Sequence, residues 1–429
     1  MRIRIGFAAT LVLVVVLALG STGTSAAPAA TPSENAVVHW SGIAEVAIAA
    51  GRPPASSTPL AAMVHGAIYD AVAAVEGGLE PFATGVTAPP EASADAAVAQ
   101  AARDVLVARV PGQAAAVQAA YDTFMASIPA GSAKDGGKAV GTAAAAGMLA
   151  MRTGDHFDDV VPYVQPTPGP GVFEPIAPTT PVDVKLGKVR PFTLDSPSEY
   201  RPGEPYELTS RRYARDVNEL KEIGGVVSSR TPFQTEHARF FSDQAYAQYS
   251  RAVRGVAVAR GLDLAESARL LGYVWVSAAD TMIACWEAKY HSYFWRPNHA
   301  IQRADTDGNP ATSPDPTWLP LLVGNHPEYP SGHACMTAAV TQSLKGYFGT
   351  KHVPMTFTSN VTGVGGPKTY ATLKDVVAAI EDARVWGGLH YRTTMKETAK
   401  HFQRIARDVG RQYFLSDLED DGPILGDDD

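Results

Sequence analysis

The sequence contains only two cysteines in 429 residues, too few for the dense cross-linking of small disulfide-rich domains. After the N-terminal region, no segment reaches the roughly 18 uncharged apolar residues that a membrane-spanning helix needs. The chain also lacks an excess of positive charge, because its formal net charge is −8, so nucleic acid is an unfavourable partner. A chain of this length can nevertheless bury a large core, in two or more structural units.

The first 26 residues predict export. Arg2 and Arg4 precede an apolar run over residues 5–19, and small residues over 21–27 offer a cleavage site near Ala26, as in a secretory signal peptide. Removing residues 1–26 takes away two arginines and no acidic residue, which changes the net charge from −8 to −10. A secreted protein is therefore expected, with a retained anchor as the alternative. The acidic end, residues 417–429, is expected to be a solvated tail.

Helical spacing of apolar residues dominates the rest of the chain, and strand signals are scarce. We therefore predict an all-α fold, built as two packed bundles of the four-helix type. The expected parts are an N-terminal bundle over 35–157, a Pro/Gly-rich connecting segment over 158–205, and a C-terminal bundle over 206–416 that carries the site. The helices are expected at residues 37–50, 60–75, 93–110, 112–127, 136–153, 209–223, 232–260, 264–290, 331–348, 373–386 and 394–414.

Three short clusters of polar residues point to an anion site. They are Lys289 with Arg296-Pro297, then Pro330-Ser331-Gly332-His333, and then Arg384 with His390. Two guanidinium groups and an ammonium group repel one another when gathered in one pocket, so a multiply charged anion is needed among them. Arginine matches the edge of such an oxyanion bidentately, whereas lysine acts as a point charge. Taken singly, each residue is most simply an ordinary surface or core residue. Together, these residues predict an oxyanion site.

The middle cluster predicts a helix start. Serine is a preferred N-cap and a helical pattern follows, so Ser331 and Gly332 are expected at a helix N-terminus. Free N–H groups and the positive end of the helix dipole attract an anion there, and glycine allows close approach. His333 and His390 add imidazoles, which can accept and return protons near neutral pH.

Read in order, the three clusters resemble the signature of the superfamily shared by vanadium-dependent haloperoxidases and type 2 phosphatidic acid phosphatases. The signature spans Lys289 to His390. The resemblance implies a vanadate cofactor, or phosphate in the other branch, with His390 as the ligand to vanadium and His333 as the catalytic acid–base group. It also implies that five residues hold the oxyanion: Lys289, Arg296, Ser331, Gly332 and Arg384.

Two local features favour the haloperoxidase branch, with hydrogen peroxide, halide and a small organic acceptor as partners. The segment 286–297 is similar to haloperoxidases beyond the minimal motif. His326 stands where bromide-using members carry histidine and chloride-using members an aromatic residue, so bromide is favoured over chloride. His326 and Trp295 are expected on the halide or substrate side. The alternatives are a secreted acid phosphatase that acts through a phosphohistidine at His390, and a non-catalytic oxyanion-binding protein.

Two questions stay open in the sequence. Thr394 stands where the phosphatases carry an acidic residue that orients their histidine, so Glu397 or a backbone carbonyl is expected to orient His390 instead. Cys285 and Cys335 flank the first two clusters and could pair in an exported chain, but two buried free thiols are the expected state.

Overall fold

The computed structural model describes residues 34–176 and 179–415. The predicted signal peptide and acidic tail lie outside the described residues. The described part is mainly helical, which confirms the all-α prediction. Its α-helices are α1 (Ala36–Ala49), α2 (Pro54–Glu76), α3 (Ala94–Arg109), α4 (Ala114–Ala126), α5 (Ser132–Met151), α6 (Arg211–Ile223), α7 (Pro232–Phe240), α8 (Ala245–Arg260), α9 (Leu264–Ser292), α10 (Pro297–Gln302), α11 (Gly332–Phe348), α12 (Leu373–Trp386) and α13 (Arg392–Val409).

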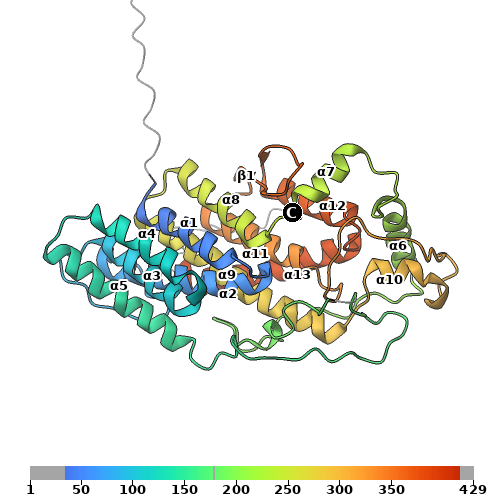
Figure 1. Cartoon of the computed structure of the whole chain (residues 1–429), viewed down its shortest axis with the longest axis horizontal. Coiled ribbons are helices and arrows are strands. Elements are labelled where there is room, and N and C mark those ends of the chain that lie inside the picture. Colours follow the sequence, from blue (N-terminus) through green and yellow to red (C-terminus); the bar gives the residue numbers. More distant parts are fainter. Residues whose placement is uncertain (1–33, 177–178, 416–429) are drawn as a thin grey trace, which may run out of the picture. The chain divides into compact units, whose positions relative to one another are not determined.

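Helix α9 lies in the core, where it packs against α2, α11 and α13. In Figure 1, α2 and α9 run between the group α3–α5 and the group α11–α13. Nearly every residue of α9 from Ser267 to Lys289 is buried, as expected for a helix that is apolar on all sides. A capping box of Asp263 and Glu266 fixes its start. From Glu34 onward the described residues form one compact unit, and the boundaries proposed for two bundles stay a prediction.

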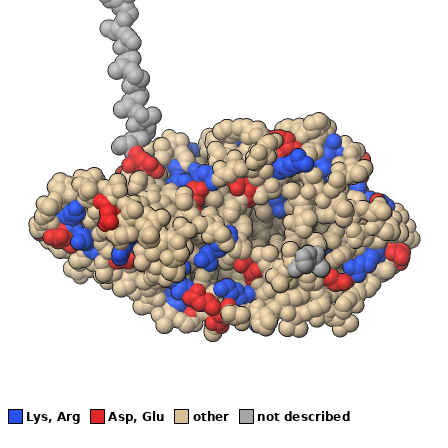
Figure 2. Space-filling model, viewed as in Figure 1, with Lys and Arg blue, Asp and Glu red and all other residues tan. Residues whose placement is uncertain are grey.

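Helix α2 is long and apolar enough, by length and composition, to cross a membrane. It instead packs against α9, α3 and α5, and 89% of its apolar window is buried inside the protein. This burial is typical of a core helix. Figure 2 shows acidic and basic side chains interspersed over one face of the molecule.

Two local predictions are wrong. The single helix expected over 232–260 is two helices, α7 and α8, separated by residues 241–244. The break has a local cause, because the Gln244 side chain accepts a hydrogen bond from the Ala247 N–H and so caps α8. The Asp243 carboxylate stabilises the break, because it accepts hydrogen bonds from the Arg251 side chain and from the Asn360 N–H. Two short antiparallel strands, β1 (Met355–Phe357) and β2 (Lys368–Tyr370), were also not expected.

The expectation of two free thiols is also wrong, because Cys285 and Cys335 form a disulfide. Cys285 lies on α9 and Cys335 on α11, two helices that pack against each other, and both residues are completely buried. Their Cα atoms are 6.5 Å apart, within the range that a disulfide can bridge. The bond joins the helix that carries Lys289 to the helix that carries His333.

Removing this disulfide is expected to lower the free energy of unfolding by about 4 kcal/mol. The estimate follows from the entropy of the chain segment that the bond closes, since the two cysteines are 50 residues apart. Chemical denaturation of the Cys285→Ala/Cys335→Ala protein, beside the oxidised wild type, measures the difference. Reduced wild type serves as the control for the substitutions themselves. A loss below about 1 kcal/mol would show that the bond does not constrain the unfolded chain as this estimate assumes.

Candidate active site

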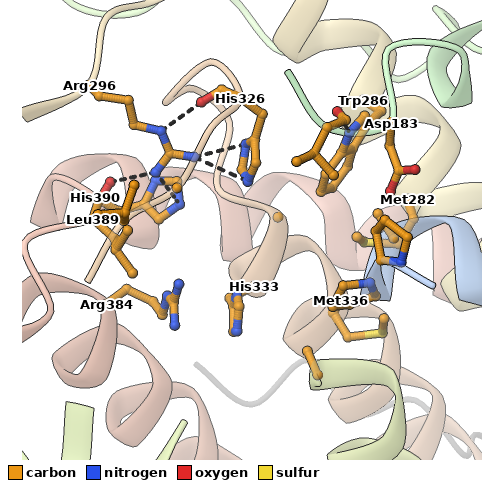
Figure 3. A pocket seen from close by; sticks show the side chains of 18 residues that line it. Asp183, Met282, Trp286, Arg296, His326, His333, Met336, Arg384, Leu389 and His390 are labelled. Atoms are coloured by element: carbon orange, nitrogen blue, oxygen red, sulfur yellow. Dashed lines mark hydrogen bonds between the residues drawn. The ribbon is translucent and has the colours of Figure 1, made fainter. Parts of the chain in front are cut away.

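The ends of several helices converge on one cavity, as the sequence predicts. Arg296 caps the start of α10, Ser331 caps the start of α11, and Arg384 lies in the last turn of α12. His390 follows α12 in the loop that leads to α13. The cavity has a volume of about 140 Å³. Figure 3 shows Arg296, His390 and Arg384 at one side of it, with His326 and His333 in the middle.

Most of the predicted site residues line this cavity, but three do not. The lining includes Arg296, His326, Gly332, His333, Arg384 and His390. Lys289 and Ser331 are completely buried and lie behind the lining. Trp295, expected on the substrate side, is buried away from the cavity, and Trp286 lines the cavity instead. Trp286 is one helical turn before Lys289, so helical spacing along α9 could have indicated it.

Arg296 is held rigidly at the cavity wall. Its Nε donates to the backbone oxygen of His326 at 2.6 Å, and Nη1 donates to the backbone oxygen of Leu389 at 2.8 Å. Nη2 lies 2.8 Å from Nδ1 of His326, and Nη1 lies 3.4 Å from Nε2 of His390. Arg296 therefore connects the segment before Ser331 to the loop that carries His390.

Glu328 orients His390, and the sequence did not reveal it. Oε1 of Glu328 lies 2.9 Å from Nδ1 of His390 and accepts from the Tyr391 N–H at 3.1 Å. Oε2 accepts from the Thr394 hydroxyl at 3.0 Å. The expected partner Glu397 instead pairs with Arg212, and its side chain is 45% exposed. Glu328 lies two residues before the second cluster, but no local pattern shows that it meets a residue 62 positions away.

The contacts around Glu328 fix the tautomer of His390. The Tyr391 N–H and the Thr394 hydroxyl both point at the carboxylate, and such donors favour its ionised form. Burial raises the pKa of Glu328 to about 7, whereas Arg296 and Lys289 lower it. Burial lowers the pKa of His390 well below its usual range, as do Arg296 and Lys289. We therefore assign a neutral His390 that donates from Nδ1 to Glu328, which leaves the lone pair of Nε2 directed at the cavity.

Two buried nitrogen atoms at the cavity have no hydrogen-bond partner among the residues that the structure describes. Among the described residues, Nε2 of His333 and Nε of Arg384 make no hydrogen bond. Arg384 is anchored at its other end, where Nη1 donates to the backbone oxygen of Phe241 at 3.0 Å. Burial lowers the pKa of His333 well below its usual range, and Arg384 lowers it further. The neutral His333 ring hydrogen-bonds to the Phe241 carbonyl through Nδ1, so Nε2 carries a lone pair, whereas Nε of Arg384 is a donor. Unsatisfied buried polar atoms are costly, so a ligand that donates to Nε2 of His333 and accepts from Nε of Arg384 would stabilise the pocket.

Gly332 brings the start of α11 against Trp286. A Cβ atom built at Gly332 would lie 2.7 Å from the indole of Trp286, which is closer than carbon atoms can pack. Any other residue here would push α11 away from α9. The glycine therefore keeps the free N–H groups of the helix start near the cavity.

The charges of this end of the pocket fit a dianion. Arg296 and Arg384 are buried cations, Glu328 is the buried carboxylate beside them, and burial lowers the pKa of the neighbouring Lys289 well below its usual range. Nζ of Lys289 donates to the backbone oxygens of Pro327 and Glu328, at 2.8 and 3.1 Å. Because the histidines are neutral, the buried basic side chains outweigh the single carboxylate of Glu328. This excess of positive charge is unfavourable unless an anion binds. The donor set and the unpartnered nitrogens fit vanadate or phosphate.

Fold and site together define an all-helical protein with a buried pocket for a tetrahedral oxyanion. Residues 269–415 match the family model of the VCPO second helical-bundle domain. A vanadium chloroperoxidase from Curvularia inaequalis is 34% identical over 120 residues, covering 23% of this chain and 19% of that protein. The match thus spans about a fifth of that relative's length.

Two solved structures share the fold. The crystal structure of the first bacterial vanadium-dependent iodoperoxidase has a TM-score of 0.72 and 21% identity, covering 88% of this chain and 95% of that chain. The crystal structure of a holo-type bacterial vanadium-dependent chloroperoxidase has a TM-score of 0.71 and 17% identity, covering 86% and 93%. The predicted resemblance to vanadium haloperoxidases is confirmed over residues 269–415 by the family model, and the two solved structures share the fold of the chain.

Proposed function

We propose that this chain is an exported, vanadate-dependent haloperoxidase that uses hydrogen peroxide to oxidise halide to a hypohalous-acid equivalent. The observation that carries the proposal is the buried cationic pocket, where His390, whose Nε2 lies 3.4 Å from Nη1 of Arg296, and the unpartnered Nε2 of His333 line one cavity. The buried disulfide supports export, because such bonds form and persist in oxidising compartments.

In this proposal each site residue has one role. Arg296, Arg384 and the N–H groups at Gly332 hold the oxyanion, and Nε2 of His390 is the ligand to vanadium. When bound, vanadate supplies a Lewis-acid centre that activates hydrogen peroxide towards halide. His333 takes a proton from the peroxide at Nε2 and returns it. Lys289, held by two carbonyls behind the lining, contributes positive potential, and Ser331 caps α11.

His326 supports bromide as the preferred halide. Its ring lines the cavity and lies against both Arg296 and Trp286, so a halide beside it would also meet the positive charge of Arg296. The relatives named above are two chloroperoxidases and an iodoperoxidase. A comparison of kcat/KM for chloride, bromide and iodide tests the preference in this chain.

A phosphatase is the second candidate, and Glu328 favours it. Phosphohistidine chemistry needs a carboxylate that orients the nucleophilic histidine, and Glu328 supplies one although Thr394 replaces the acidic residue of the phosphatase motif. In this case Nε2 of His390 attacks the phosphoester and His333 protonates the leaving alcohol.

One titration distinguishes these functions. Metal-free protein receives increasing vanadate, and bromide-dependent oxidation of a phenolic dye by peroxide is recorded beside hydrolysis of a phosphate ester. Dye oxidation that rises with vanadate until the site is saturated is the expected result. Hydrolysis that vanadate inhibits would favour the phosphatase. Tight vanadate binding with neither activity would leave a non-catalytic oxyanion-binding protein.

A further inference from the structure

The cavity has a second, apolar side that the oxyanion does not use. It is formed mainly by Trp286, Met282 and Met336, together with Pro53 and Pro54 from the start of α2, and Asp183 is the acidic residue on this side. Figure 3 shows the two methionines and Trp286 on the side opposite Arg296 and His390, with His333 between the two sides. Oxidised halogen that leaves the cationic side toward the methionines would pass this wall.

Among the described residues, the two methionines are buried from the outer surface but border the cavity. Met282 is 2% exposed and Met336 is 1% exposed, yet both line the pocket. Met336 lies three residues after His333 on α11, so both side chains share one face of that helix. Met282 lies four residues before Trp286 on α9, which places it on the face that Trp286 presents to the cavity.

Thioethers are readily oxidised by hypohalous acid. The sulfur loses two electrons and gains the oxygen atom, while the halogen is reduced to halide and a proton is released. Each methionine thus becomes a sulfoxide, which replaces an apolar wall with a polar one. The oxidant is the product of the proposed function, and no other co-reactant is needed.

We propose that Met282 and Met336 are modification sites, oxidised to sulfoxides by the hypohalous acid that the enzyme produces when no organic acceptor intercepts it. The inference rests on the proposed haloperoxidase function. In this proposal an organic acceptor is halogenated at the apolar wall. Without an acceptor, oxidation of the two methionines at the same wall limits the number of turnovers that the enzyme completes. An acceptor bound against Trp286 would protect both sulfurs.

The chain supplies its own matched controls. Met63, Met148 and Met355 are as deeply buried as Met282 and Met336, but they do not line this cavity. Peptide mass spectrometry after turnover with vanadate, bromide and peroxide, without an acceptor, should show an added oxygen atom on Met282 and Met336. Met63, Met148 and Met355 should be unchanged. The same protein with peroxide but without bromide should show no such selectivity.

The possible failures can be told apart. Bromide oxidation with unmodified Met282 and Met336 would overturn the modification proposal alone, and so would equal oxidation of Met63 and Met148. If no halide is oxidised, the proposed function fails, and this inference fails with it. A Met282→Leu/Met336→Leu protein provides a second measurement, since leucine preserves volume and packing. It should complete more turnovers than wild type before its activity is lost, and an unchanged turnover number would contradict the proposed lifetime limit.

Discussion

Replacing His333 by alanine is expected to lower turnover by about 10²–10⁴-fold, which is the range for loss of a positioned acid–base group. Most of the oxyanion affinity should remain. Nε2 of His333 has no partner among the described residues, and the Phe241 carbonyl that loses its hydrogen bond to the His333 ring keeps Nη1 of Arg384 as a donor. The cations Arg296 and Arg384 and the ligand nitrogen of His390 stay in place. Steady-state kinetics with bromide and calorimetric titration with vanadate measure the two effects separately.

His390→Ala is the contrasting variant, because it removes the nitrogen assigned as the ligand to vanadium. It should lose vanadium affinity as well as turnover. His291→Ala is a suitable control, since His291 is on the same helix as Lys289 but its side chain is 44% exposed and pairs with Glu204. A His333→Ala protein that keeps the full rate would show that the acid–base role is assigned to the wrong residue.

The cationic part of the site could be predicted because its residues lie in short contiguous motifs of the sequence. Ser331 and Gly332 stand next to each other, and the N-cap preference of serine is local, so the helix start at Gly332 follows from the sequence. Arg384 and His390 are likewise close in the chain. The packing of α9, α11 and α12 then brings these ends together.

Contacts between distant residues could not be predicted in this way. Cys285 meets Cys335 because α9 and α11 pack against each other, and Glu328 meets His390 across 62 positions. Trp295 and Trp286 are equally plausible wall residues in the sequence. Trp286 shares a face of α9 with Lys289 and lines the cavity, whereas Trp295 follows the end of that helix and does not.

Glu328→Gln is expected to destabilise the protein and weaken oxyanion binding together. Glutamine keeps the shape of the side chain and one acceptor oxygen, so His390 can still be oriented in part. The charge is lost, and Lys289, Arg296 and Arg384 are then buried without a carboxylate. Removing one partner from a buried group of charges costs about 3–5 kcal/mol. Loss of a residue that orients a metal ligand lowers metal affinity by about 10–100-fold.

Unfolding by denaturant and vanadate titration of Glu328→Gln measure both losses. Glu397→Gln is the matched control, because Glu397 is half-exposed and pairs with Arg212 at the surface, where an ion pair contributes at most about 1 kcal/mol. Saturating phosphate should recover part of the stability of Glu328→Gln, since a ligand that binds only the folded state stabilises it and supplies the missing negative charge.

A second substitution distinguishes the effect of the Glu328 charge from the effect of the position of its carboxylate. Thr394 donates to Glu328 at 3.0 Å, so Thr394→Asp in the Glu328→Gln protein returns a carboxylate to the neighbourhood of His390, at the position that the phosphatase motif uses. If Glu328 acts by its charge, the double variant should regain stability and vanadate affinity relative to Glu328→Gln. If it regains neither, the position of the carboxylate relative to Nδ1 of His390 is decisive, and the pair Glu328 and Thr394 works only in this arrangement.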